Sequence, residues 1–483
     1  MTHLEPLDQV GEPDLAEGGS IFHSRGFVTL WSAQVLSQLA SNMVLAALIA
    51  VVYGSTGSNT ANAILILTFL LPAVVFSAIA GVIVERADAR LIMLGANVLR
   101  ALGTILFILV GGNVPLILAI NLFIATVTAF FAPAELTALP RIVARRHLMA
   151  ANSVFVLTVN ATFAIGFGFL GALLLNLAGP TAVYVVVAVM FGLAALAIIP
   201  LPSVPPEQHG AAGAEAGRAA RELASQLREG IEFVRRNRQI AWSLTYLGIS
   251  ASLIGVMGAI GPGFAREILR LQPKDFFFIM GPAGLGAVVG ILFLNAYASR
   301  VPRRLIIDIG LLAMGVTLIA LAVVKPITGF LAPAVHPIES NLPQALSPIV
   351  SLIAVVVVIA LTAGVEYAFV AIPSQTALQE DLPPDVRGRI FGILNMLLSL
   401  ASFLPVIVAP AGADLLNLIF PGAGIPVVMA ILGCGTLVAG FFSWRRNARA
   451  GLHAWDASGP SGGHRRRRRA AQKVDAQLGP DAE

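Results

Sequence analysis

The sequence predicts an all-α membrane protein with twelve transmembrane helices in two six-helix lobes. Three observations lead to this fold class: the composition, the number of long apolar runs, and a repeat between the two halves. Of the 483 residues, 57% are apolar and 12% are charged, whereas a soluble domain has about a quarter charged residues. About 275 apolar residues (57% of 483) suffice for about twelve spans of about 20 residues each. This composition excludes soluble enzymes, disordered scaffolds and nucleic-acid-binding domains, and no nucleic-acid partner is expected.

The first six spans make up the predicted N-terminal lobe, residues 26–201, which follows a cytoplasmic tail at 1–25. Each span is an apolar run long enough to cross a bilayer as a helix. The expected spans are 27–53, 61–84, 91–111, 114–137, 152–177 and 181–201. The tail has no apolar core, so the first span itself is expected to direct membrane insertion.

Residues 202–239 are the predicted cytoplasmic linker between the lobes. The segment is first rich in Pro, Gly and Ala and then becomes charged. Leu223, Leu227 and Ile231 recur every four residues among charged side chains, a pattern typical of an amphipathic helix. This helix either lies on the inner membrane surface or is a solvated linker helix with an ordinary apolar stripe.

The second six spans make up the predicted C-terminal lobe, residues 240–444. The expected spans are 240–265, 276–297, 305–324, 348–374, 388–415 and 423–444. Residues 325–347 form a proline-rich loop that is too polar to span. Residues 445–483 are a basic, disordered cytoplasmic tail. Arg465 to Arg469 within it either contact anionic lipids or serve only topology and solubility.

Basic residues concentrate on alternate connections, which predicts the orientation. One side receives an Arg-rich stretch at 218–238 and Arg25, Arg86, Arg90, Arg141, Arg145, Arg146, Arg300, Arg303, Arg304, Arg387 and Arg389. The other side receives Arg266, Arg270, Lys274 and Lys325. Because positive charge stays inside, both termini are expected in the cytoplasm of a multi-pass protein in a bacterial-type inner membrane.

Two features of the first half recur in the second. The connection Gly81–Ile92 is similar to Gly290–Ile306, and the end of the fourth span, Pro133–Leu139, is similar to Pro373–Leu378. Both copies lie on the same predicted side of the membrane, so the repeat is a parallel duplication of six spans. Two such halves are the plan of a rocking secondary transporter, and transport is inferred from this architecture.

These residues resemble the major facilitator superfamily. Its cytoplasmic loop signature, Gly-x-x-x-Asp-Arg-x-Gly-Arg-Arg, is similar to Gly81, Glu85, Arg86, Asp88 and Arg90 of this sequence. More narrowly, the sequence is similar to the drug and siderophore exporter branch, which includes enterobactin- and macrolide-type exporters. The similar stretches are 130–134, 151–153, 229–235 and 384–392. The resemblance implies a transporter that exports its substrate by alternating access and is coupled to protons.

The sequence departs from the superfamily at four places. The loop has Glu85 for Asp and Asp88 for Gly, and the first span has Ser41-Asn42 where an Asp is common. The fifth span has Gly166–Gly171 without the proline that antiporters commonly show there. An importer or an uncoupled facilitator of the same fold therefore remains an alternative.

A gate is expected at the inner ends of the second and eleventh spans. A carboxylate such as Glu85 can meet the positive N-terminal end of a neighbouring helix. Arg86 and Arg90 can pair with carboxylates or carbonyls across the seam between the lobes. By resemblance, the partner of Glu85 is the start of the eleventh span, at Arg387, Gly388 and Arg389. The alternative is that these arginines only follow the positive-inside rule.

Polar side chains within the spans indicate a substrate cavity. Gln34, Gln38, Ser41 and Asn42 are spaced to share one face of the first helix. Asn160 lies midway along the fifth span. Intramembrane polar groups are costly and tend to face a cavity, and the resemblance implies that spans one, four, seven and ten line it. The alternative is hydrogen bonding between helices without substrate contact.

Two intramembrane carboxylates are candidates for ion coupling. Glu366 of the tenth span is the best candidate for a proton carrier, because a carboxyl group in a low-dielectric cavity can titrate in the working range. Glu135 of the fourth span is the second candidate, and its position near the inner surface also suits the gate.

Two further intramembrane charges are expected to be structural. Arg100 of the third span needs a carboxylate or carbonyl partner inside the membrane. Asp308 of the ninth span is expected to pair with Arg303 or Arg304. Close helix packing is expected at Gly286-x-x-x-Gly290 and at two glycines of the fifth span, Gly168 and Gly171.

No enzymatic activity, metal site or cofactor is expected, because the sequence has neither a Walker-type motif nor a metal-ligand cluster. The driving force is then expected to be a proton gradient. The expected partners are the lipid bilayer and a small, fairly apolar substrate, handled by a monomer. An alternative from another class is a non-transporting membrane protein, such as a sensor or a lipid-handling protein.

Overall fold

The computed structural model describes most of the apolar part of the chain. The described residues are 21–144, 147–205, 225, 228, 230–297, 301–327, 347–380 and 387–449. Within these ranges the chain is helical and has no strand. Eleven helices in them are long and apolar enough to cross a membrane. The all-α membrane fold class predicted from the sequence is confirmed.

The first four helices of the N-terminal lobe start at polar N-caps. Its helices are α1 (Arg25–Thr56), α2 (Asn59–Arg86), α3 (Ala89–Val110), α4 (Val114–Ile142), α5 (Leu148–Thr162) and α6 (Gly171–Ile198). The N-cap residues of the first four are Ser24, Ser58, Asp88 and Asn113. Their side-chain oxygens accept backbone N–H groups of the first turn, which otherwise have no partner within the helix.

The fifth and sixth crossings are joined without a separate loop. A π-helix, η3 (Phe163–Leu170), connects α5 to α6. The helix α6 then breaks at Gly179, whose φ of 79° is left-handed, directly before Pro180. This break separates the predicted spans 152–177 and 181–201. The eleven continuous helices therefore agree with twelve predicted spans, because α6 contributes to two of them.

The C-terminal lobe follows after the linker. Its elements are α8 (Arg238–Glu267), η4 (Pro273–Phe276), α9 (Phe277–Tyr297), α10 (Arg303–Ala322), α12 (Ser347–Glu380), α13 (Arg387–Ile419) and α14 (Gly424–Arg449). In the linker, residues 230–236 are helical and Ile231 is exposed. The other two residues of the predicted amphipathic stripe, Leu223 and Leu227, lie outside the described residues. So does the basic tail with Arg465 to Arg469.

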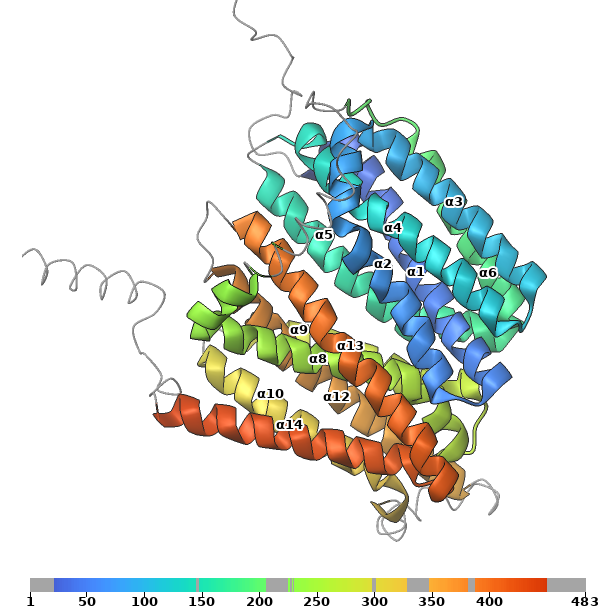
Figure 1. Cartoon of the computed structure of the whole chain (residues 1–483), viewed down its shortest axis with the longest axis vertical. Helices are drawn as coiled ribbons and strands as arrows, with labels where there is room; N and C mark the ends of the chain where they lie inside the picture. Colours follow the sequence, from blue (N-terminus) through green and yellow to red (C-terminus); the bar gives the residue numbers. More distant parts are fainter. Residues whose placement is uncertain are drawn as a thin grey trace, which may run out of the picture.

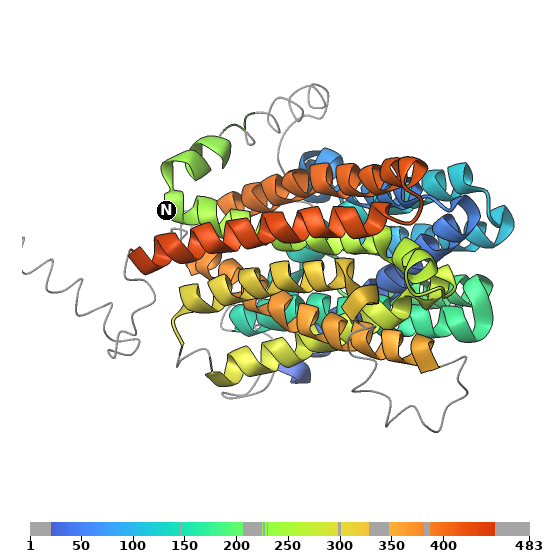
Figure 2. The same cartoon turned by 90° about the horizontal axis from the view of Figure 1, so that it is seen from below.

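The two lobes repeat the same packing. In the N-terminal lobe, α3 packs against α6, α2 against α4, and α1 against η3. In the C-terminal lobe, α10 packs against α14, α9 against α12, and α8 against α13. Figure 1 shows the two groups side by side, blue to teal for the first and green to red for the second. Figure 2 shows α14 and α10 at the outside of the second group.

Glycines allow the closest helix contacts, as the sequence predicted. A Cβ added at Gly286 would overlap the backbone of Leu361, and one at Gly290 would crowd Val365. Both contacts join α9 to α12. In the fifth crossing, Gly171 faces Met43 of α1 within its own lobe. Gly168 instead faces the Met280 carbonyl of α9, so it brings the two lobes together.

Candidate functional site

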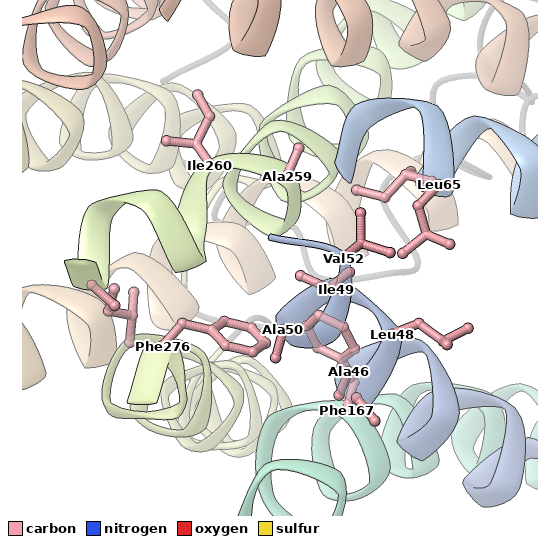
Figure 3. Packing of buried hydrophobic residues seen from close by; sticks show 14 of the residues in the cluster. Ala46, Leu48, Ile49, Ala50, Val52, Leu65, Phe167, Ala259, Ile260 and Phe276 are labelled. Atoms are coloured by element: carbon pink, nitrogen blue, oxygen red, sulfur yellow. The ribbon is translucent and has the colours of Figure 1, made fainter. Parts of the chain in front are cut away.

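The lobes meet at one end of the molecule. We call it the distal end; it holds the α1–α2 and α13–α14 connections. The opposite end, where α1 begins and α14 ends, is the terminal end. In the distal half, one hydrophobic core includes buried residues of both lobes. Figure 3 shows its α1 and α2 side chains together with Ala259 and Ile260 of α8 and Phe276 of η4.

Specific contacts cross the seam within this core. The rings of Phe167 in η3 and Phe276 in η4 meet edge to face, with centroids 6.2 Å apart. Gly258 of α8 is positioned against Ile49 of α1 and Ile66 of α2. These contacts pack α1, α2 and η3 of the N-terminal lobe directly against α8 and η4 of the C-terminal lobe.

The terminal half is organised differently. Its buried apolar residues form three separate clusters, and each cluster belongs to a single lobe. One joins the ends of α1 to α6 in the N-terminal lobe. The other two lie within the C-terminal lobe, around Leu311 and around Leu247. Apolar packing of the described residues therefore joins the lobes distally and not at the terminal end.

A carboxylate closes the distal seam beside the shared core. Asp414 of α13 accepts hydrogen bonds from the Ser58 hydroxyl at 2.7 Å, the Asn59 side-chain amide at 2.7 Å and the Thr60 hydroxyl at 2.7 Å. It also accepts the backbone N–H groups of Asn59 at 3.2 Å and Thr60 at 2.8 Å. Residues 58–60 are the N-cap and first turn of α2. A side chain of the C-terminal lobe thus caps a helix of the N-terminal lobe.

A second carboxylate lies nearby. Glu267, the last residue of α8, accepts the Tyr53 hydroxyl of α1 at 3.3 Å and the Asn417 amide of α13 at 3.0 Å. Its backbone carbonyl accepts the Lys325 ammonium at 3.4 Å. Of these three groups, Tyr53 alone comes from the opposite lobe, so Glu267 contributes one cross-lobe hydrogen bond.

The predicted polar stripe of α1 overlaps the start of the shared core, which begins at Ala40 on this helix: Gln34 and Gln38 lie on its terminal side, and Ser41 and Asn42 lie level with its first residues. Gln34 is buried and its Oε1 has no hydrogen-bond partner. Gln38 and Asn42 are half-buried, and Asn42 packs against Gly166 of η3, where a Cβ would overlap it. The stripe is thus at mid-height, next to the point where the lobes separate.

Arg100 and Glu135 lie together inside the N-terminal lobe. The Arg100 guanidinium donates to the Asn97 side-chain oxygen at 2.7 Å and to the Ala96 carbonyl at 3.3 Å. It also stacks over the Phe131 ring, 4.4 Å from the centroid. Glu135 is buried, its Oε1 has no hydrogen-bond partner, and its charge interacts with that of Arg100. Arg100 therefore has the oxygen partners that the sequence required.

Glu366 is placed against a helix of its own lobe. Its Oε1 accepts the Thr317 hydroxyl of α10 at 2.8 Å, and its buried Oε2 has no hydrogen-bond partner. The carboxyl group is thus held between α10 and α12. Its predicted role in coupling stays a prediction.

At the terminal end, Asp88 anchors the chain that leaves the N-terminal lobe. The carboxylate caps α3 through the Arg90 N–H at 2.9 Å. It also accepts the Ser203 hydroxyl at 2.5 Å and the Val204 N–H at 3.0 Å. Partial burial raises the pKa of Asp88, but these hydrogen bonds outweigh it, so its pKa lies below the ordinary value of 3.8. Asp88 is therefore ionised when it binds the segment after α6.

Two arginines complete this anchor. Arg90 donates to the Ile199 carbonyl, and Arg141 donates to the Pro205 carbonyl at 2.6 Å. Neither contact reaches the C-terminal lobe, whereas the sequence suggested a cross-seam partner for Arg90. In this conformation, the loop arginine binds the carbonyl at the end of α6.

The other predicted gate residues are located on the backbone alone. Gly81 and Glu85 belong to the last turns of α2, and Arg387, Gly388 and Arg389 begin α13. The side chains of Glu85 and of these α13 residues are outside the described part of the structure, as is the Asn160 side chain of α5. Arg86, which ends α2, is half-buried.

Asp308 belongs to a buried network of the C-terminal lobe. It is fully buried on α10 and accepts hydrogen bonds from Ser443 and from Asn447, at 2.9 Å, on α14. The network extends to α8 through the Tyr246 hydroxyl, which lies 2.6 Å from the Ser443 hydroxyl. These contacts join three helices and indicate a structural role. The predicted pairing of Asp308 with a nearby arginine, Arg303 or Arg304, stays a prediction.

The sequence did not single out the residues of the distal seam. Asp414 lies at the end of an apolar run, and its donors at 58–60 are about 355 positions earlier. One signal was present: Ser58, Asn59 and Thr60 form a polar N-cap cluster, and Asp414 is an acidic residue at the same predicted level. Pairing the two required knowledge of which helices are neighbours.

The two-lobed fold is matched by a family model. The model described as Major Facilitator Superfamily matches residues 30–406. The chain belongs to the Major Facilitator Superfamily. The resemblance noted in the loop signature is confirmed, and with it the expectation of a transporter instead of an enzyme.

Several curated members of the superfamily are similar to this chain. The uncharacterized MFS-type transporter YkuC of Bacillus subtilis is 28% identical over 228 residues, covering 46% of this chain and 52%, about half, of YkuC. Macrolide efflux protein A of Streptococcus pyogenes is 23% identical, covering 80% of this chain and 89% of that protein. The multidrug efflux pump Tap of Mycobacterium tuberculosis is 24% identical, covering 77% and 82%.

A solved transporter structure shares the fold. The nucleoside transporter NupG has a TM-score of 0.63 at 13% identity, covering 87% of this chain and 98% of NupG. At this identity the similarity is one of fold. It agrees with the twelve-helix, two-lobed layout.

Proposed function

We propose that this protein is a secondary active transporter that exports a small, fairly apolar molecule by alternating access, driven by a proton gradient. The observation that carries the proposal is the one-sided closure of the lobes. The shared core and Asp414 join them distally, and the clusters at the terminal end stay within single lobes. Such a protein can expose a central site to one side at a time.

The direction of transport is supported by two lines of reasoning. The charge of the connections favours a cytoplasmic terminal end, so the distal end would face outward and the described conformation would be open to the cytoplasm. In addition, the relatives named macrolide efflux protein A and multidrug efflux pump Tap are efflux proteins by name. We propose that this chain works as a monomer in a bacterial inner membrane.

The central residues support the proposed class of substrate. The α1 stripe offers amides and a hydroxyl, Gln34, Gln38, Ser41 and Asn42, and no fixed charge. Amide groups fix the orientation of a ligand through hydrogen bonds, and apolar neighbours take up its surface. A small molecule with a few polar groups fits this composition better than an ion or a sugar.

An uncoupled facilitator is the second candidate. Two observations favour it: α1 has Ser41 and Asn42 in place of a carboxylate, and Glu366 is hydrogen-bonded to Thr317 within its own lobe. The two candidates differ in their response to a pH gradient and not in their ability to exchange substrate.

Counterflow in liposomes tests the proposal. Purified protein should exchange a labelled macrolide or dye without any gradient, and a pH gradient should drive its accumulation against concentration. Exchange without accumulation would favour the facilitator. The absence of exchange with every compound that stabilises the purified protein in a thermal-shift screen would contradict a transport function.

A further inference from the structure

We propose that Asp414 is the gate residue of the distal end: its carboxylate holds the lobes closed by capping α2, and its release opens that end. The proposal deepens the transport function above and rests on it for its role in the cycle. The contact itself can be tested without any substrate.

Hydrogen-bond donors occupy all the acceptor sites of the Asp414 carboxylate. Oδ1 accepts the two Asn59 donors, and Oδ2 accepts the Ser58 hydroxyl and both Thr60 donors. A carboxylate offers about four lone-pair sites, so five donors occupy it fully. All five belong to the opposite lobe. The contact therefore exists only while the lobes are closed at this end.

The negative charge of Asp414 matters for this contact. The first N–H groups of α2 have no partner within the helix and lie at the positive end of its dipole. Hydrogen bonds from such groups to an ionised carboxylate are stronger than those to a neutral acceptor. A neutral amide at position 414 would keep the shape and lose much of the attraction.

The contact is also reversible without loss of α2. Ser58 caps the helix within its own lobe, because its hydroxyl oxygen accepts the Ala61 N–H at 3.2 Å. In this cap the Ser58 oxygen is the acceptor, and the same hydroxyl group donates its hydrogen bond to Asp414. When the lobes part, Ser58 can keep its capping bond, and the N–H groups of Asn59 and Thr60 can donate hydrogen bonds to water instead of to Asp414.

The remaining seam contacts are weaker or less directional. Glu267 accepts one cross-lobe hydrogen bond, at 3.3 Å from Tyr53, and the Asn62 amide donates to the Ala259 carbonyl at 3.3 Å. The Asn176 amide of α6 donates to the Lys274 carbonyl of η4 at 3.4 Å, and the core that the two lobes share is apolar. Asp414 therefore supplies the main charged contact among the described residues of this seam.

A thiol reporter tests the proposal. The single native cysteine is replaced by Cys434→Ser, and Ile66→Cys places a thiol where α2 meets α8. In lipid nanodiscs without substrate, the labelling rate of this thiol with a polar maleimide should be low. Adding Asp414→Asn should raise the rate about tenfold, because hydrogen bonds to a charged group are lost.

Two controls separate gate opening from unfolding. Asp275→Asn removes another acid of the distal end, whose carboxylate accepts only the local Gln272 N–H among the bonds described here, and should leave labelling unchanged. A thiol introduced by Leu311→Cys, in the core of the C-terminal lobe, should stay protected. If Asp414→Asn exposes this second thiol too, Thr60→Val replaces it as the test variant and should raise labelling at position 66 alone.

The proposal would be overturned if the Ile66→Cys thiol were labelled at the same rate in the protein with Asp414 and in the Asp414→Asn variant. The labelling uses no substrate, so this result would leave the transport function untouched. Conversely, a protein without counterflow could still show the opening, and the transport function alone would then be wrong.

Discussion

The role of a side chain in this protein depends on which part of the molecule its hydrogen-bond partners belong to. Asp88 and Asp414 are both helix-capping carboxylates, but Asp88 binds the segment that directly follows its own lobe and Asp414 binds the opposite lobe. In the proposed transport cycle, the first contact would persist and the second would break. Residue type alone does not distinguish these roles; the identity of the partner does.

The Asp88 anchor should respond to acid. Its pKa is lowered in the folded protein, so its contribution is present above the ordinary value of 3.8 and is lost as the pH falls through the folded pKa. We expect amide exchange at Val204, corrected for intrinsic rate, to stay slow from neutral pH to about pH 4 and to accelerate below it. Asp88→Asn should accelerate it at neutral pH as well. Unchanged exchange in that variant would contradict the anchor.

Glu366 is the residue through which proton coupling can be tested. Glu366→Gln keeps an acceptor for the Thr317 hydroxyl and removes the titratable proton. We expect counterflow to stay within about twofold of the unmodified protein while the response to a pH gradient is lost. Glu135→Gln is the matched comparison. Loss of the response with Glu135→Gln, and not with Glu366→Gln, would transfer the coupling role to Glu135.

At the level of elements, close contacts between helix backbones decide how the lobes are built. The helices α9 and α12 approach so closely that Gly286 lies against Leu361, and Gly364 against Ala283. The π-helix η3 brings Gly168 to the backbone of α9 across the seam. Small residues and a widened turn thus set both an intralobe interface and part of the distal closure.

Gly286 should therefore tolerate no side chain. We expect Gly286→Ala to destabilise the protein by about 1–3 kcal/mol, because the new Cβ must push α12 away. Gly192→Ala on α6 is the matched control: its Cβ would meet nothing within 4 Å, so a change between zero and about 1 kcal/mol of stabilisation is expected. Thermal unfolding in detergent measures both. If Gly286→Ala had the same melting temperature as the unmodified protein, α12 would be able to move away from the new Cβ without loss of stability.

At the level of the whole molecule, the fold was largely predictable from the sequence, because bilayer thickness fixes the length of each apolar run. The break between the fifth and sixth crossings was visible as Gly179-Pro180. The contact of Asp414 with the start of α2 was not predictable. It depends on α13 lying beside the start of α2, and no local pattern around Asp414 or Ser58 reveals that neighbour. Contacts such as Glu366 with Thr317 depend on helix rotation for the same reason.

The α2–α13 pair has a consequence for the energetics of the cycle. Asp414, from the distal part of α13, caps the start of α2. The predicted contact of Glu85, from the terminal part of α2, with the start of α13 is the reverse arrangement. Each helix would then offer a carboxylate at one end and a free helix start at the other. Opening one side would exchange one such contact for the other, which keeps the two states close in free energy, so that a substrate of modest affinity can shift their populations.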